Sequence, residues 1–267
     1  MKNLLKQYPM PNTNQLITEI LAKKLRCVFI SPHLDDAVLS CGGLMQELAR
    51  KTELTVINVF TSAHSGPYTL SARKFLQASG DFSNAAELYQ ARIEEDQRAL
   101  LKLGVNVTNL GLKDALFRRK PKESLFGKIL PEFNHVYPTY KWHITGSVNK
   151  NDPALADLRK QLEKLNLKEA VVFAPYGIGN HVDHQLVSAV SRSLFKKLVL
   201  YSDFPYNIRL DDYGSENGMY RKIELTPNLK EKIKLIKFYQ TQFTGLFSDG
   251  EVPGHKEVYF VKKVDGK

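Results

Sequence analysis

Short runs of β-branched and aromatic residues alternate with helical patterns along most of the chain. Apolar runs bounded by turn residues are typical of buried strands, and apolar residues spaced three and four apart predict helices. We predict strands at residues 27–30, 54–60, 105–110, 170–174, 198–201 and 258–261. The predicted helices cover residues 37–50, 84–103, 182–196 and 229–241. Gly104 stands where a helix usually ends, and Asn228 is expected to cap the last helix.

This alternation predicts the fold class. Strands that alternate with helices imply βαβ crossovers and a parallel sheet that is covered on both faces. In such an open sheet, ligands bind beyond the carboxyl ends of the strands. We therefore predict an α/β protein with a Rossmann-like, mostly parallel sheet, helices on both faces, and its functional site at the C-terminal edge of the strands.

One stretch of more than fifty residues has few strand signals and contains four prolines, Pro121, Pro131, Pro138 and Pro153. Loops of this length in a compact domain are usually functional or partly ordered insertions. We predict an insertion at about residues 115–169 that runs over the C-terminal edge of the sheet and includes a small helix at 153–165. Residues 1–267 as a whole are expected to form a single domain.

Composition narrows the class of protein. The chain has 267 residues, of which 43% are hydrophobic and 25% charged, values of an ordinary globular protein rather than a disordered or fibrous one. No stretch approaches the ~20 apolar residues of a membrane-spanning helix, and the N-terminus lacks the apolar run of a signal peptide. We expect a cytoplasmic protein with no membrane span, in which Cys27 and Cys41 are reduced and buried.

The formal net charge is +10, which can indicate a polyanionic partner. The charge is scattered, however, and only two short basic clusters occur: Arg118, Arg119, Lys120 and Lys122, and Lys230, Lys232, Lys234 and Lys237. We interpret these clusters as solvated faces, and we expect no nucleic-acid partner. A non-catalytic basic protein that binds polyanions is the alternative from another class.

Two polar clusters follow predicted strands at the same edge of the sheet, at residues 31–36 and 180–184. Imidazole and carboxylate groups are common zinc ligands, and a catalytic zinc site uses three of them and keeps a position for water. His33 and Asp36 are three apart, as are His181 and His184, so each pair can converge on one ion. Four candidates are one too many, so one histidine should have another role.

Each of these residues also has an ordinary explanation. A histidine at the end of a strand is usually a hydrogen-bonded loop residue, and Asp35, Asp36 and Asp183 could cap the helices that follow them. Their joint occurrence at one sheet edge favours a metal site instead. Gly42 and Gly43 lie inside the next predicted helix and could allow close packing of that helix on the sheet. They do not form the GxGxxG pattern of a dinucleotide site.

The sequences SPHLDDAVLSCGG (31–43) and NHVDH (180–184) resemble the two signature motifs of the PIG-L/LmbE-like metal-dependent N-deacetylases. That family removes acetyl groups from N-acetylglucosamine carried on lipids, thiols or antibiotics. The resemblance extends to residues 92–95, 110–114 and 238–242, and it covers most of the chain except the 115–169 insertion.

The resemblance implies that His33, Asp36 and His184 hold the metal, which is usually Zn²⁺, with Fe²⁺ as another candidate. It implies that Asp35 is the general base.

It further implies that His181 stabilises the oxyanion and protonates the leaving amine, and that Asp183 orients His181. Arg92 and Asp114 match positions that help to bind the sugar. From the residues alone, Arg92 would pair with Glu95 or Asp96 on the surface of a helix.

The chain departs from the family pattern at four positions. Leu34 and Val182 replace prolines that are common there, Ala37 replaces a glutamate, and Gly179 stands where some members carry a tyrosine that assists the oxyanion. None of these changes removes an implied ligand or the implied base. They concern the rigidity of the turns and the contacts around the site.

The expected activity is that of a zinc-dependent hydrolase that removes the N-acetyl group of an N-acetylglucosamine-type amino sugar or its conjugate and releases acetate. A related metal amidase that acts on a larger acyl group or a thiol conjugate is the alternative within enzymes. The expected partner is the small-molecule substrate, and a homo-oligomer remains open.

Overall fold

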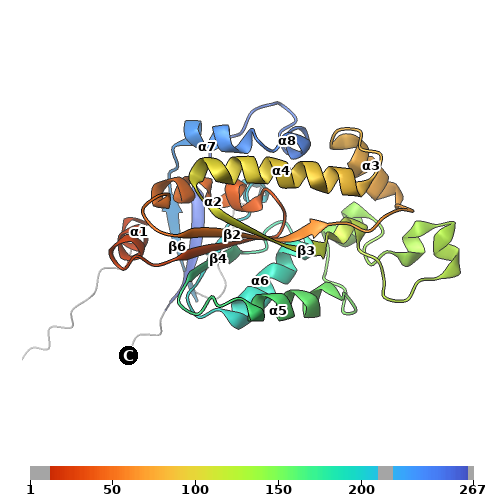
Figure 1. The fold of residues 1–267 in the computed structure, drawn as a ribbon, viewed down its shortest axis with the longest axis horizontal. Helices are drawn as coiled ribbons and strands as arrows, with labels where there is room; N and C mark the ends of the chain where they lie inside the picture. The colour runs from red at the N-terminus through yellow and green to blue at the C-terminus, as the bar shows by residue number, and fades with distance from the viewer. Residues whose placement is uncertain (1–12, 210–218, 264–267) are drawn as a thin grey trace, which may run out of the picture.

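A seven-stranded sheet forms the centre of the molecule (Figure 1). The computed structural model describes residues 13–209 and 219–263. The strands run in the spatial order β3-β2-β1-β4-β5-β7-β6. Their bounds are Cys27–Ser31 (β1), Leu54–Ser62 (β2), Asn106–Lys113 (β3), Val171–Pro175 (β4), Leu198–Tyr201 (β5), Tyr220–Leu225 (β6) and Glu257–Lys262 (β7).

Five of the strands are parallel. β1 pairs with β2 and with β4, β2 also pairs with β3, and β4 pairs with β5, all in parallel register. β7 is antiparallel to β5, and β6 is antiparallel to β7. The predicted Rossmann-like, mostly parallel sheet is therefore confirmed. β6 and the reversal of strand direction at this end of the sheet were not predicted from the sequence.

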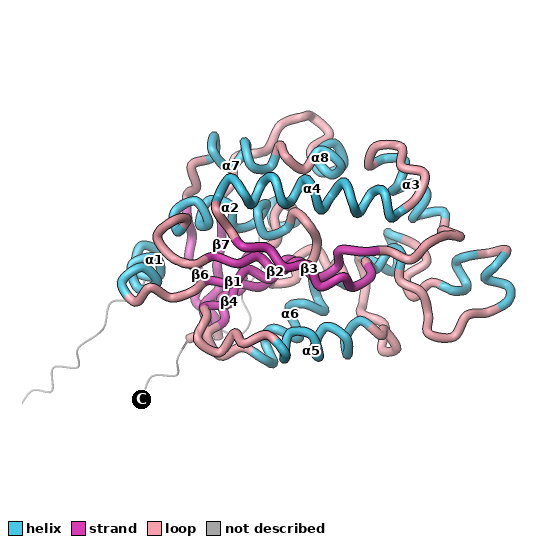
Figure 2. Tube along the Cα trace, viewed as in Figure 1, coloured by secondary structure: helices cyan, strands magenta, loops and turns pink. Residues whose placement is uncertain are grey.

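Helices cover both faces of the sheet, as predicted (Figure 2). Side chains alternate between the two faces along a strand, so Phe29 of β1 joins the core under one layer, and Val28 and Ile30 join the core under the other. The first layer contains α1 (Thr13–Ala22), α2 (Asp36–Leu48), α4 (Ala85–Leu103) and α7 (Leu229–Ile236). The second contains α5 (Ala154–Lys164) and α6 (Val182–Leu194).

The predicted insertion is built mainly of short turns. They are η1 (Ala115–Phe117), η2 (Leu125–Lys128), η3 (Pro131–Asn134) and the π-helical turn η4 (Tyr140–Ile144), and α5 follows them close to the small helix predicted at 153–165. In Figure 1 the yellow-green segment of η2 and η3 projects beyond the end of the sheet at which β2 and β3 finish. The inner part of the insertion packs in a separate apolar cluster that includes Phe117, Tyr137 and Ile144.

Two helical predictions differ from the structure. The predicted helix 229–241 is broken, since α7 ends at Ile236 and α8 (Gln240–Leu246) begins four residues later. Tyr239 has non-helical backbone angles at this break and buries its ring, with its hydroxyl donating to Asp96. The helix α3 (Leu70–Ala78), which lies between β2 and α4, was not predicted. Local periodicity misses both features because tertiary contacts decide them.

Gly43 lies where α2 approaches the strand β7 and the loop before α7. A Cβ atom on Gly43 would lie 2.4 Å from Cβ of Pro227, so the glycine allows this close packing. Glu257 of β7 accepts the backbone N–H of Gly43 at 2.7 Å and binds Nζ of Lys232 at 2.6 Å. Lys232 is completely buried, so the expectation that this basic cluster is solvated throughout is wrong at Lys232.

Within the two described ranges, every helix is too short or too polar to cross a lipid bilayer. Cys27 and Cys41 are free and buried, as predicted.

Candidate metal centre and active site

The turn after β1 brings His33 and Asp36 together. The hydroxyl of Ser31 donates to the carbonyl of His33 at 2.5 Å and accepts the N–H of Ala37 at 3.0 Å, which closes the turn at the start of α2. The backbone N–H of His33 donates to Oδ2 of Asp36 at 2.8 Å. The carboxylate of Asp36 is therefore directed back toward His33 and does not cap its own helix.

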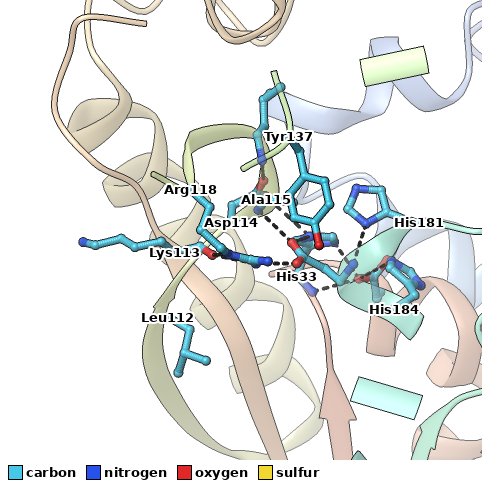
Figure 3. A network of polar contacts seen from close by, with 12 residues as sticks. His33, Leu112, Lys113, Asp114, Ala115, Arg118, Tyr137, His181 and His184 are labelled. Carbon is cyan, nitrogen blue, oxygen red and sulfur yellow. Dashed lines mark hydrogen bonds and ion pairs between the residues drawn. The ribbon is translucent and has the colours of Figure 1, made fainter. Parts of the chain in front are cut away.

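His184 of α6 completes a group of three potential ligands around one point (Figure 3). Oδ2 of Asp36 lies 3.1 Å from Nδ1 of His33 and 3.2 Å from Nε2 of His184. All three residues are buried. The structure thus brings together the three residues for which the family resemblance implied metal binding.

This group fits a tetrahedral divalent ion. Metal–ligand bonds of about 2.0–2.2 Å place tetrahedral ligands about 3.3–3.5 Å apart, close to the spacings around Asp36. Within the described chain, Nε2 of His184 is buried, and its 3.2 Å contact with Asp36 lacks hydrogen-bond geometry. A buried nitrogen without a well-formed hydrogen bond is costly, and a bound ion would satisfy it.

In His33 and His184, the ring nitrogen that faces away from Asp36 is bound by another carboxylate. Oδ1 of Asp203 lies 2.6 Å from Nδ1 of His184, and Oδ2 of Asp183 lies 3.2 Å from Nε2 of His33. Metal-binding histidines commonly have such a partner, which fixes the tautomer and the orientation of the ring. Asp203 was not predicted, although it follows β5 at the same edge of the sheet.

The charge around these histidines favours a cation. Burial opposes protonation of His33, but hydrogen bonds to Asp183 and Asp36 outweigh it and raise its pKa to about 10. Burial likewise opposes protonation of His184, yet the charge of Asp36 and the hydrogen bond to Asp203 raise its pKa well above the usual value. The excess of carboxylates that draws protons here would also attract a divalent ion.

A second group, His33, His181 and Asp183, also has the spacing of metal ligands. The carboxylate of Asp183, however, binds the guanidinium of Arg118 and accepts the N–H of Ala115 at 2.9 Å. Its charge is already paired, so Asp183 suits an orienting role better than a place on the ion.

Arg118 is buried rather than solvated, so the sequence interpretation of its basic cluster is wrong at this position. Besides Asp183, it binds Asp152 at 2.5 Å and the carbonyl of Lys113 at 2.8 Å. Figure 3 shows how it reaches from the start of the insertion toward the histidine group. One guanidinium thereby joins β3, the insertion and α6.

Asp35 and Arg92 face each other at the site. Oδ1 of Asp35 lies 3.4 Å from Nη2 of Arg92, and both residues are buried. Arg92 is therefore not on the helix surface, where the residues alone would have placed it. Burial raises the pKa of Asp35 to about 6, although the charge of Arg92 opposes this shift.

A cavity of about 330 Å³ opens beside these groups. Its polar lining includes His33, Asp35, Asp36, Arg92, Asp114 and His181. Apolar and aromatic walls come from residues that the sequence analysis did not assign to the site, among them Leu39, Phe75, Leu116, Tyr140 and Tyr206. The volume is in the range of small-molecule sites.

His181 reaches the cavity from the N-terminus of α6. Its Nδ1 accepts the backbone N–H of Asp183 at 3.3 Å, which leaves Nε2 for a ligand in the cavity. This hydrogen bond comes from the backbone of Asp183, whose carboxylate binds Arg118 and His33. Burial and the charge of His33 keep the pKa of His181 well below its usual value, and the charge of Asp183 offsets them only in part.

Three departures from the family motifs have structural explanations. Leu34 and Val182 are buried in the apolar cluster beneath the insertion, so each supplies a packing side chain where proline is common. Gly179 has φ +84°, and a Cβ atom there would lie 2.8 Å from Cγ of Tyr206. The ring of Tyr206 therefore occupies the space beside this glycine. It lies edge-on to His184, with 5.7 Å between the ring centroids.

Two of the other segments that resemble the family, around residues 92–95 and 238–242, are in contact with each other. Glu95 of α4 accepts both the backbone N–H and the hydroxyl of Thr241, at 3.0 and 2.7 Å. Asp96 accepts the hydroxyl of Tyr239 at 2.8 Å. These bonds hold α8 beside the cavity, which Thr241 helps to line.

Comparison with known proteins gives relatives over nearly the whole chain. A 2'-N-acetylparomamine deacetylase of Niallia circulans is 26% identical over 266 residues, which cover 89% of this chain and 91% of that protein. The protein of the same name from Streptomyces fradiae is 26% identical over 226 residues, which cover 83% and 68% of the two chains.

Solved structures share the fold. A deacetylase of the teicoplanin biosynthesis pathway superposes with a TM-score of 0.65 at 21% identity, over 90% of this chain and all of that one. The A40926 pseudoaglycone deacetylase gives 0.59 at 23% identity, over 89% and 96%. The model of the PIG-L family, described as GlcNAc-PI de-N-acetylase, matches residues 28–195, which include both histidine clusters. The chain belongs to the PIG-L family of deacetylases.

Proposed function

We propose that this protein is a metal-dependent hydrolase that removes the N-acetyl group of an N-acetylglucosamine-type amino sugar or its conjugate and releases acetate. The convergence of His33, Asp36 and His184 beside the buried Asp35, at the edge of a cavity, carries the proposal. The relatives named 2'-N-acetylparomamine deacetylase support an N-acetylated amino sugar as the substrate class.

His33, Asp36 and His184 would hold the ion, and Asp203 and Asp183 would orient the two histidines. Zn²⁺ and Fe²⁺ both suit imidazole and carboxylate ligands. A solved structure with the same fold is a zinc-inhibited form of teicoplanin deacetylase. Because zinc inhibits that protein, the metal of this chain should be identified by titration with Zn²⁺ and with Fe²⁺ separately. A divalent ion at this place would lower the pKa of water and polarise an amide carbonyl.

Asp35 would act as the general base. It is buried beside the candidate ligands and lines the cavity. As the water oxygen bonds to the acetyl carbon, the carboxylate of Asp35 takes the water proton. Arg92, 3.4 Å away, would hold the carboxylate in place. Arg92 and Asp114 also line the cavity, where they would contact the sugar.

His181 would act on the other side of the reacting amide. With Nδ1 bound to the backbone of Asp183 and its pKa lowered by burial, His181 is a neutral imidazole whose Nε2–H would donate a hydrogen bond to the oxyanion. As the proton that Asp35 took from the water moves to His181, Nε2 would pass its own proton to the departing nitrogen. The C–N bond breaks as this proton arrives. The products are acetate and a free amine, and the water supplies the added oxygen and hydrogen.

Replacing the base tests this function. With N-acetylated amino sugars as substrates, we expect Asp35→Asn to keep its metal and to lose at least about 10²-fold in acetate release, the usual contribution of a general base. Asp157→Asn, which alters an exposed carboxylate on α5, should keep wild-type turnover. Turnover near the wild-type rate in Asp35→Asn would exclude Asp35 as the base.

A panel of substrates separates the alternatives. Larger acyl groups and thiol conjugates would use the same metal site, so comparing their kcat/KM values with those of N-acetyl sugars decides between them. A polyanion-binding protein would instead show salt-dependent affinity that Asp35→Asn leaves unchanged. The three carboxylates in the cavity, Asp35, Asp36 and Asp114, disfavour a polyanion there.

A further inference from the structure

Five large apolar side chains are exposed within nine residues of the insertion. They are Leu125 (80% exposed), Phe126 (73%), Ile129 (81%), Leu130 (54%) and Phe133 (56%), and we call them the apolar tip. Single exposed apolar residues are ordinary, but clusters of them mark interaction surfaces.

The local structure directs these side chains outward. The turns η2 and η3 close around Asn134, which is buried. Its amide oxygen accepts the N–H of Ser124 at 2.7 Å, and its amide nitrogen donates to the carbonyl of Ser124 at 3.2 Å. A Cβ atom on Gly127 would lie 2.0 Å from Cγ of Asn134. A polar side chain thus fills the inside of this segment, and the apolar side chains face solvent.

Basic residues accompany the apolar tip. Lys120, Lys122 and Lys128 are exposed in the same segment. The two acidic residues of the segment already have partners: Glu123 pairs with Arg119 of the same segment at 3.1 Å, and Glu132 accepts the N–H of Leu70 at 2.9 Å. Residues 119–133 contain four basic and two acidic side chains, a net charge of +2. A complementary surface must be both apolar and negatively charged.

We propose that the apolar tip docks on the surface of an anionic lipid bilayer. Leucine, isoleucine and phenylalanine side chains would enter the boundary between head groups and acyl chains, and the lysines would lie among the lipid phosphates. The tip projects beyond the end of the sheet (Figure 1), so it can reach a flat surface before the rest of the molecule. A second copy of the chain is the less favourable occupant because two positively charged tips repel each other.

Docking would bring the catalytic edge close to the lipid. Glu132 of η3 binds the backbone of Leu70, and the next residue, Ser71, accepts the backbone N–H of Tyr140 at 3.3 Å. Tyr140 lines the active-site cavity. This proposal concerns where the protein binds and does not depend on the reaction that it catalyses.

Co-sedimentation of the full chain with vesicles tests the proposal. We expect binding to vesicles of phosphatidylcholine and phosphatidylglycerol at a 3:1 ratio, at least tenfold weaker binding to phosphatidylcholine alone, and release by 0.5 M salt. The double variant Phe126→Ser/Ile129→Ser should bind the anionic vesicles at least tenfold more weakly. Leu101→Ser, which changes a side chain on α4 that is 79% exposed, should bind as the wild type does.

Lys122→Glu/Lys128→Glu should also weaken binding to the anionic vesicles at least tenfold. Equal binding of the wild type and the Phe126/Ile129 variant, or no binding of the wild type to either vesicle, would overturn the proposal. So would a wild-type dimer in sedimentation equilibrium that becomes a monomer in that variant, because a second copy would then cover the tip. Circular dichroism checks that each variant is folded.

Discussion

At the scale of single residues, the site depends on carboxylates that bind the imidazole nitrogens facing away from the candidate metal position. Oδ1 of Asp203 binds Nδ1 of His184, while its Oδ2 accepts the backbone N–H groups of Gly177 and Ile178 at 2.8 and 2.9 Å. The same side chain therefore orients a candidate ligand and shapes the loop before the second motif. The aspartate can do both because it has two acceptor oxygens.

Asp203→Asn should weaken metal binding. The variant keeps an acceptor oxygen but loses the charge that makes His184 a better ligand, so we expect metal affinity to fall about ten- to a hundredfold. Isothermal titration of the metal-free protein measures the change. Asp157→Asn is the matched control on an exposed carboxylate. Wild-type affinity in Asp203→Asn would show that Asp203 does not support a ligand.

Asp96 predicts a pH-dependent contribution to stability. Burial raises its pKa to about 7, against the hydrogen bonds that Tyr239 and Asn58 donate to it. Between about pH 4, where the unfolded carboxyl ionises, and pH 7, the folded protein retains this proton and the unfolded chain does not. The contribution of Asp96 to stability therefore falls as pH rises through this range.

Asp96→Asn removes this effect. The free energy of unfolding of the variant, minus that of the wild type, should rise steadily from pH 4 to pH 7 and then level off. Urea denaturation at several pH values measures it. A difference that stays constant with pH would show that Asp96 titrates alike in the folded and unfolded states.

At the scale of elements, the insertion is joined to the sheet edge by one buried guanidinium. Arg118 binds Asp183 of α6 and Asp152, two residues before α5, and it lies over the ring of Phe60 of β2 at 4.7 Å from the centroid. The next residue, Arg119, makes a partly exposed pair with Glu123. Arg118 thus binds two buried carboxylates, whereas Arg119 binds an exposed one.

Arg118→Ala should therefore cost far more stability than Arg119→Ala. Removing Arg118 takes the guanidinium away from two buried carboxylates. Breaking a buried ion pair lowers the free energy of unfolding by ~3–5 kcal/mol. A partly exposed pair such as Arg119–Glu123 is worth about 1 kcal/mol or less. Denaturant unfolding of both variants measures the difference, and similar losses would contradict the network described here.

The elements that the sequence predicts well are those with local signals. Gly104 ends α4 with φ +67°, and Asn84 caps its start by accepting the N–H of Glu87. β6 (Tyr220–Leu225) was missed because its sequence, YRKIEL, has charged residues among few apolar ones and forms an edge strand. The antiparallel direction of β7 could not be predicted either, since strand direction depends on the path of the chain between strands.

At the scale of the whole molecule, the contacts that could be predicted are those between residues of one turn or of one sheet edge. His33, Asp35 and Asp36 share one turn, and His181 and His184 share another, so motif and sheet edge sufficed to predict their meeting. Arg118, 65 positions before Asp183, meets it only because the insertion folds back. Asp203 could have been found, because it follows a predicted strand at the same edge, but it lacks a histidine neighbour in sequence.

The metal content of the purified protein tests the central claim most directly. Elemental analysis should find about one divalent ion per chain, the stoichiometry of an open three-ligand site. His184→Ala should lose the ion, and His143→Ala, which changes an exposed histidine of the insertion, should keep it. A wild-type protein that retains no ion after reconstitution with one equivalent of Zn²⁺ or Fe²⁺, or a His184→Ala variant that retains it fully, would contradict the account.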